Sequence, residues 1–120
     1  MVKSSKINVG ITVGDPNGIG IEIILKSLSN FSLFHECNFV IYASTGLIEK
    51  QKQHFQIDTP PLKKIDSEED LSDTQINIKE VFSNSQFNFG ESDKELSALG
   101  ILSLKEATKA IKDKKIDVLV

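Results

Sequence analysis

The sequence predicts an α/β fold: a parallel-type sheet with helices on both faces. Two short apolar runs, Ile7–Val13 and Asn38–Ala43, are each followed by a segment with helical character. Runs that are apolar on both faces are typical of central strands in a parallel sheet. A loop with three glycines, Gly14–Gly20, separates the first strand from its helix, and the alternation of strand and helix indicates βαβ units.

Two helices are expected in the first half of the chain. The apolar residues of the first recur at the three-to-four spacing of a stripe that faces a core. They are Ile21, Ile24, Leu25 and Leu28. The second helix covers Gly46–Phe55, where Ser44 and Thr45 offer a hydroxyl as the cap.

The middle of the chain is less regular. Two prolines precede Leu62–Ile65, which is expected to be extended. Apolar and polar residues alternate in Gln75–Phe82, which predicts an edge or half-exposed strand. A polar connection, Ser83–Phe89, follows.

A long helix and a final strand are predicted for the last third. Ser92 and Glu95 have the spacing of a capping box, with Ser92 as the cap. The predicted core face of the helix consists of Leu96, Leu99, Ser103, Leu104, Ala107 and Ile111. Gly100 costs about 1 kcal/mol relative to alanine within a helix, so it indicates the close approach of another backbone or of a ligand.

The strand Ile116–Val120 bears on domain organisation. Ligands bind beyond the carboxyl ends of strands in open parallel sheets, and a buried strand is an unusual terminus. We therefore expect residues 1–120 to be the N-terminal part of a larger protein, with no internal domain boundary.

Composition excludes several classes of function. The net charge is −3 and no basic cluster is interleaved with aromatic residues, so a nucleic-acid partner is not expected. No apolar segment is long enough for a signal peptide or a membrane span, which predicts a cytoplasmic protein without a membrane partner. A single cysteine, Cys37, excludes an intrachain disulfide. Neither His35 nor His54 has a further ligand at metal-binding spacing.

The loop between the first strand and helix is the candidate site. Its candidate cofactor-binding or cleft-lining residues are Gly14, Asp15, Pro16, Asn17 and Gly18. The spacing matches neither the dinucleotide fingerprint nor a Walker loop. Exposed backbone N–H groups could bind an anion here, but the residues also suit a structural turn. Asp15 suits either a ligand contact or a hydrogen bond with its own backbone.

The segment Val9–Glu22 closely resembles the N-terminal signature of the 4-hydroxythreonine-4-phosphate dehydrogenase family, whose usual form is I-T-x-G-D-P-A-G-I-G-P-E. Gly90–Val120 matches as well, and the resemblance runs over essentially the whole chain, most weakly in Thr59–Phe89. Asn17 replaces a common alanine and Ile21 a usual proline. Neither change removes a chemical group, so both are expected to be tolerated.

The resemblance implies a fold similar to that of isocitrate and isopropylmalate dehydrogenases, here incomplete. It implies a homodimeric, NAD-dependent enzyme of pyridoxal 5'-phosphate (vitamin B6) biosynthesis, which oxidises a small phosphorylated hydroxy amino acid that then loses carbon dioxide. It also implies a divalent metal. The metal ligands and catalytic residues are expected beyond Val120, so none is assigned within this sequence and the 120 residues alone are expected to be inactive.

Two alternatives stay open. One is a dehydrogenase for another phosphorylated hydroxy acid, such as 4-phosphoerythronate. The other is a non-catalytic α/β binding module. The N-terminal signature does not separate the two substrate classes, because specificity is expected to lie in later residues.

Overall fold

The structure, a computed structural model, describes residues 6–120 and contains one sheet of five parallel strands. The strands are β1 (Ile7–Thr12), β2 (Cys37–Ala43), β3 (Leu62–Ile65), β4 (Ile76–Glu80) and β5 (Val118–Leu119), in the order β3-β4-β2-β1-β5. The helices are α1 (Gly20–Leu28), α2 (Thr45–Phe55) and α3 (Lys94–Lys112), with short 3-10 helices at Phe31–His35 and Glu68–Asp70. This arrangement confirms the predicted α/β class.

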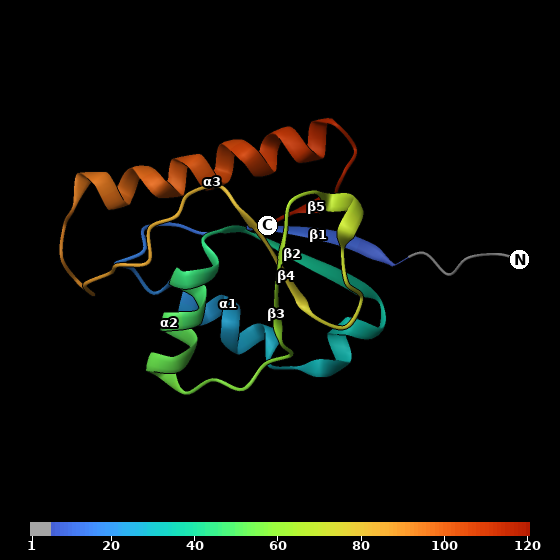
Figure 1. The fold of residues 1–120 in the computed structure, drawn as a ribbon, viewed down its shortest axis with the longest axis horizontal. Coiled ribbons are helices and arrows are strands. Elements are labelled where there is room, and N and C mark those ends of the chain that lie inside the picture. Colours follow the sequence, from blue (N-terminus) through green and yellow to red (C-terminus); the bar gives the residue numbers. More distant parts are fainter. Residues whose placement is uncertain (1–5) are drawn as a thin grey trace, which may run out of the picture.

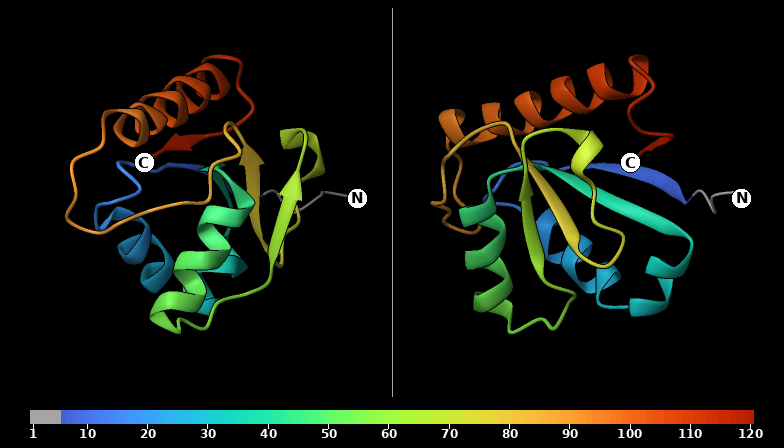
Figure 2. Two further views of the ribbon diagram at one scale, coloured as in Figure 1. Left: turned by 60° about the vertical axis from the view of Figure 1, so that its left-hand side comes forward. Right: turned by 45° about the vertical axis from the view of Figure 1, so that its right-hand side comes forward.

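Helices cover both faces of the sheet, as predicted. The helices α1 and α2 lie on one side, and α3 crosses the other side (Figures 1 and 2). The side chains of β2 show the two environments, since Phe39 and Ile41 join the core under α1 and α2 whereas Val40 and Tyr42 join the core under α3. This alternation follows from the two-residue period of a strand.

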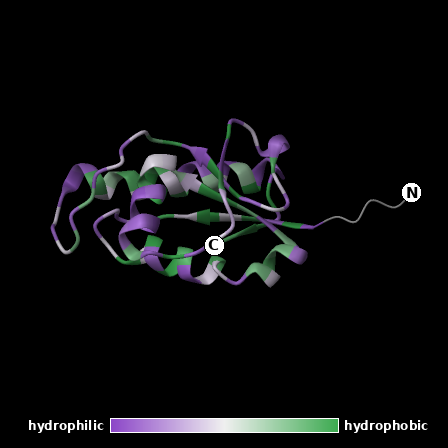
Figure 3. Ribbon diagram, turned by 60° about the horizontal axis from the view of Figure 1, so that its bottom comes forward, coloured by the Kyte–Doolittle hydropathy of each residue, from purple (hydrophilic) through white to green (hydrophobic). Residues whose placement is uncertain are grey.

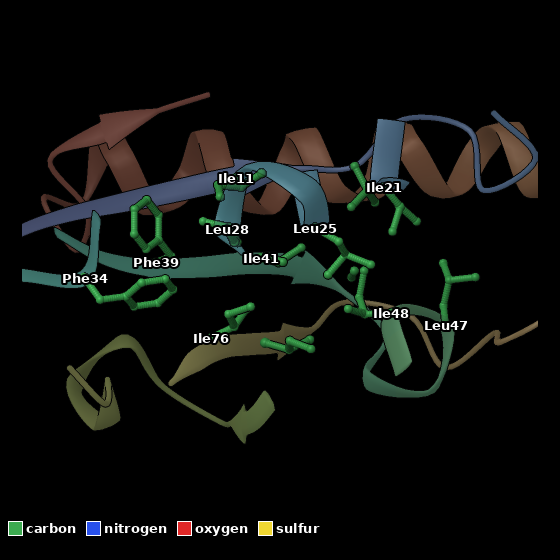
Figure 4. Close-up of a cluster of buried hydrophobic side chains, with 13 residues drawn as sticks. Ile11, Ile21, Leu25, Leu28, Phe34, Phe39, Ile41, Leu47, Ile48 and Ile76 are labelled. Atoms are coloured by element: carbon green, nitrogen blue, oxygen red, sulfur yellow. The ribbon is translucent and has the colours of Figure 1, made fainter. Parts of the chain in front are cut away.

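The larger core lies between the sheet and α1 with α2 (Figure 4). Its fully buried aliphatic residues include Leu25, Ile41, Leu47, Ile48, Ile76 and Ile78. Burying each such side chain contributes about 1.5–3 kcal/mol, which makes this layer the main source of stability. Apolar residues run through the central strands, whereas the surrounding loops are mostly hydrophilic (Figure 3). Within residues 6–120, no helix combines the length and the apolar character needed to cross a membrane.

The face that α3 buries differs from the predicted one at two positions, since Leu104 is predicted to be buried and Ala110 is not. Ser103, Ala107 and Ala110 are buried, but Leu104 is 53% exposed. The physical reason is the short distance between the axis of α3 and the sheet. Small side chains allow this close approach, whereas a leucine in the contact would push the helix away from the strands.

β4 is an interior strand, so the prediction of an edge or half-exposed strand is wrong. It pairs with β2 on one side and with β3 on the other. Its polar residue Asn77 is fully buried, and its amide donates to the carbonyl oxygens of Phe39 (2.9 Å) and Ser72 (3.0 Å). A buried amide with its own partners thus produced the alternation that suggested a solvated face.

The N-cap of α3 is Asp93, not Ser92. The Asp93 carboxylate accepts hydrogen bonds from the backbone N–H groups of Glu95 (2.9 Å) and Leu96 (3.2 Å). Aspartate and serine are both strong N-cap residues, so the sequence alone does not show which of the two adjacent residues is the cap. The cap of α2 is confirmed, because the Ser44 hydroxyl accepts from Leu47 N–H at 3.3 Å.

A buried charge cluster joins β2, β4 and the second 3-10 helix. Glu68 is 6% exposed, and its carboxylate accepts from the Tyr42 hydroxyl at 2.9 Å and pairs with Lys79 at 3.1 Å. Burial by itself raises the pKa of Glu68, but hydrogen bonds from its own backbone amide, from Lys79 and from Tyr42 outweigh burial and lower that pKa. Burial, followed by the bond to Glu68, raises the pKa of Tyr42.

Glu68 should therefore stabilise the fold in a pH-dependent way. Because its pKa is lower in the folded chain than the ordinary 4.5, its contribution is present above that pH and is lost as the pH falls through the folded pKa. We expect Glu68→Gln to lower the free energy of unfolding at neutral pH by about 1–3 kcal/mol, and the difference from wild type to shrink below pH 4.5. Denaturation by urea at several pH values measures this. The exposed neighbour Glu69→Gln is the control, and a difference that is the same at every pH contradicts the assignment.

Candidate functional site

The candidate site lies at the carboxyl edge of the sheet. The glycine loop, Gly14–Gly20, leaves β1 at this edge and leads into α1. The connector, defined here as residues 84–93, follows β4 and leads into α3; it passes beside the glycine loop (Figures 1 and 2). Ligands of open parallel sheets bind at this edge.

The helix α3 packs directly on the start of the glycine loop. A Cβ built on Gly100 would lie 3.1–3.3 Å from the backbone atoms of Gly14. Three residues further along, the Ser103 hydroxyl accepts from Val13 N–H at 2.9 Å and donates to the carbonyl oxygen of Tyr42. The prediction that Gly100 marks a close approach is confirmed, and the neighbour is backbone.

Asp15 is occupied by internal hydrogen bonds. One carboxylate oxygen accepts from the N–H of Asn17 at 2.9 Å, and the other accepts from the Ser97 hydroxyl of α3 at 3.0 Å. Its carbonyl oxygen accepts from Gly18 N–H at 2.8 Å. Of the two roles left open by the sequence, the structure therefore shows the backbone hydrogen bond.

Pro16 and Asn17 are buried and face the protein. The carbonyl oxygen of Pro16 accepts from the side chain of Gln51, a fully buried residue of α2, at 2.9 Å. The Asn17 side chain donates to the carbonyl oxygen of Glu91 at 3.0 Å and accepts from the N–H of Asn88. The sequence alone treats Asn17 as a tolerated replacement, but its carboxamide joins the loop to the connector.

The outer surface of the loop is open at two glycines. A Cβ on Gly14 or on Gly20 would meet no heavy atom within 4 Å beyond the chain neighbours. The N-cap of α1 is Ile19, which makes no side-chain cap hydrogen bond. The free face that this loop offers to a ligand thus consists of backbone, whereas its polar side chains hold it in shape.

A hollow of about 450 Å³ lies between the glycine loop, α2 and the connector. Its lining includes Asn17, Lys50, Phe87, Asn88, Glu91 and Leu96. The lining mixes one cation, carboxylates, amides and apolar groups, so its charge favours no single class of ligand.

The described residues do not form a metal centre. No group of three or more histidine, cysteine, aspartate or glutamate residues within 6–120 is placed to hold an ion. His54 instead packs against Phe55, Phe87 and Phe89, with ring centroids 4.8, 6.0 and 5.4 Å away. This cluster attaches the connector to α2, a role that the sequence does not reveal because Phe87 and Phe89 are far from His54 along the chain.

The Gly100 contact makes a prediction about stability. Alanine normally stabilises a helix relative to glycine, but a Cβ at Gly100 must displace the backbone of Gly14, which does not yield as a side chain would. We expect Gly100→Ala to lower the free energy of unfolding by about 1 kcal/mol or more. Gly20→Ala, where a Cβ meets open space, is the matched control and should be neutral or stabilising by up to about 1 kcal/mol. Urea denaturation of both variants decides, and a stabilised Gly100→Ala contradicts the close contact.

Comparison with known proteins gives the relatives of the chain. No family model matches it. A 4-hydroxythreonine-4-phosphate dehydrogenase from Sulfurihydrogenibium is 32% identical over 114 residues, which are 95% of this chain and 34% of that enzyme. A protein from Oceanobacillus iheyensis, provisionally assigned as a D-threonate 4-phosphate dehydrogenase, is 38% identical over 73 residues, 61% of this chain and 22% of its own length. The chain thus spans about a third or less of the length of these relatives.

Solved structures share the fold. A 4-hydroxythreonine-4-phosphate dehydrogenase from Burkholderia phymatum superposes with a TM-score of 0.83 at 21% identity, and one from Klebsiella pneumoniae with 0.78 at 22%. Each match covers 96% of this chain and 36% of the solved chain. This chain is therefore similar in sequence and in fold to about one third of the length of the 4-hydroxythreonine-4-phosphate dehydrogenases, which confirms the family resemblance indicated by the glycine loop.

Proposed function

We propose that this chain is part of an NAD-dependent dehydrogenase that oxidises the secondary alcohol of 4-hydroxythreonine 4-phosphate in pyridoxal 5'-phosphate biosynthesis. The observation that carries the proposal is the 32% identity to a 4-hydroxythreonine-4-phosphate dehydrogenase over 95% of the chain. The location of the signature loop at the carboxyl edge of the sheet supports it, because dehydrogenases with open parallel sheets bind their ligands there.

Within such an enzyme, we assign the glycine loop one wall of the cleft for cofactor or substrate. Gly14 offers backbone with no side chain in the way, and ligand atoms can therefore approach it closely. Asp15, Pro16, Asn17 and Gly18 support this wall from behind through their internal hydrogen bonds. When bound, NAD supplies the hydride acceptor. The role of these four residues is to set the shape of the wall and keep it rigid.

The residues described do not fit the divalent metal that the resemblance implies. They contain no suitable group of ligands, and His54 is engaged in an aromatic cluster. We assign metal ligation and catalysis to segments other than this chain, and we assign no step of the reaction to a metal held by residues 6–120.

A second substrate has specific support. The relative assigned to D-threonate 4-phosphate is 38% identical over its 73 matched residues. That name describes a phosphorylated hydroxy acid, the same chemical class as 4-phosphoerythronate. Both substrate classes carry a phosphate and a secondary alcohol, so one cleft wall serves either. The family resemblance also supports a homodimer in the cytoplasm as the working form.

A substrate panel tests the proposed function. The protein that contains this chain should reduce NAD with 4-hydroxythreonine 4-phosphate, and more slowly with D-threonate 4-phosphate or 4-phosphoerythronate, as followed by NADH absorbance. The reverse order of rates would move the assignment to the phosphorylated hydroxy acids. No reduction with any of the three, by a folded protein supplied with divalent metal, would favour the non-catalytic module.

Substitutions at Gly14 test the cleft wall separately. Because a Cβ there points into open space, Gly14→Ala and Gly14→Leu should leave the free energy of unfolding nearly unchanged. In the dehydrogenase they should raise KM in order of size, by about tenfold or more for leucine, since the side chain occupies ligand space. Asp66→Leu, in an exposed loop after β3, is the control for an added leucine at the surface. An unchanged KM in Gly14→Leu would contradict the assignment of the glycine loop to the wall of the cleft.

A further inference from the structure

We propose that Asn17 is a positioning residue, which clamps the connector onto the glycine loop and thereby sets the shape of the hollow between them. The clamp consists of contacts within this chain, so it does not depend on the proposed function. Its effect on a reaction rests on the proposed function.

The carboxamide of Asn17 binds backbone on both sides. It is 5% exposed, donates to the carbonyl oxygen of Glu91 at 3.0 Å and accepts from the N–H of Asn88. The carbonyl oxygen of Asn17 also accepts from Gly90 N–H at 3.1 Å. Three successive polar contacts thus tie residues 88–91 to one residue of the loop.

These contacts enclose a turn of defined geometry. The N–H of Glu91 donates to the carbonyl oxygen of Asn88 at 3.2 Å, and Gly90 has a φ of 81°. A positive φ at the third position is typical of a type II turn, where glycine is favoured. Because the carboxamide of Asn17 is both donor and acceptor, it satisfies one N–H and one carbonyl of this turn, which neither alanine nor ionised aspartate can do.

Asn17 is itself held rigidly, so it can act as an anchor. Its own N–H donates to the Asp15 carboxylate, and the preceding carbonyl, of Pro16, accepts from the buried Gln51 side chain. Asp15 in turn is held by the Ser97 hydroxyl of α3. The turn is therefore fixed relative to α2 and α3, because both helices hold the glycine loop to which Asn17 belongs.

The connector depends on such anchors because it contains no helix or strand. Its other contacts include Phe87 and Phe89 against the ring of His54, and Ser85 close to Gly46, where a Cβ would lie 3.2 Å from Ser85. Both of these attach it to α2. Asn17 attaches it to the glycine loop, so loss of the carboxamide should open the hollow on that side.

Hydrogen exchange of backbone amides tests the clamp in this chain. In Asn17→Ala, the amide of Asn88 loses its acceptor and should exchange about tenfold faster. The amides of Gly90 and Glu91 keep their main-chain acceptors, the carbonyl oxygens of Asn17 and Asn88, and should exchange faster by a smaller factor because the turn opens more often. The amide of Ile41 in β2 should keep its wild-type rate. In Asn17→Asp, which keeps an acceptor, the amide of Asn88 should stay closer to wild type than in Asn17→Ala.

A second variant guards against general unfolding. Gly90→Ala leaves Asn17 intact and adds no close contact, but it strains the turn at a φ of 81°, and it should give the same local increase in exchange. Unchanged exchange at residues 88–91 in both Asn17→Ala and Gly90→Ala overturns the clamp. So does an increase spread evenly over the sheet in both variants, because that reports a global role.

Kinetics then test what the clamp does. In the full dehydrogenase, Asn17→Ala should raise KM by about fivefold with kcat changed less than about twofold, because the hollow's shape and not the reacting groups is altered. Faster local exchange with unchanged KM overturns the link to binding. If the wild-type protein reduces no NAD with any substrate, the proposed function fails while the exchange result still decides the clamp.

Discussion

The contact between Gly100 of α3 and the backbone of Gly14 governs the geometry of the carboxyl edge. It requires a glycine in the middle of a helix, and it brings the Ser103 hydroxyl within reach of Val13, just after β1, and of Tyr42 in β2. Ser97 then reaches Asp15 from the same helix. A bulkier residue at position 100 would move α3 away, and the hydrogen bonds of Ser97 to Asp15 and of Ser103 to Val13 would be lost together.

Support for the site is therefore built from polar side chains that face inward. Asp15, Asn17 and Gln51 are the residue types that sequence reasoning associates with ligand contacts, yet in this structure each bonds to the protein backbone or, for Asp15, also to a serine. What remains for a ligand is bare backbone at Gly14 and the uncapped start of α1. This division of labour suits the cleft wall proposed above, where a rigid main chain would let a small anionic molecule approach backbone N–H groups.

Sequence reasoning recovers those parts of the fold that depend on local patterns. The interior strands β1 and β2, the stripe of α1 and the special role of Gly100 follow from apolar periodicity and from helix propensity. The interior position of β4 cannot be predicted in this way, because the hydrogen-bond partners that allow Asn77 to be buried lie on other segments. The clamp formed by Asn17 likewise cannot be predicted from the sequence, since residues 88–91 lie more than seventy positions away and are bound through their backbone.

That backbone recognition has a consequence for how the site can change. Because Asn17 holds main-chain atoms of the turn and Gly90 supplies its conformation, the side chains of Gln86, Asn88 and Glu91 take no part in the clamp. These side chains line the hollow. In the proposed dehydrogenase, point substitutions at these connector positions should therefore change the ligand preference of the hollow without altering the backbone contacts that hold the connector in place.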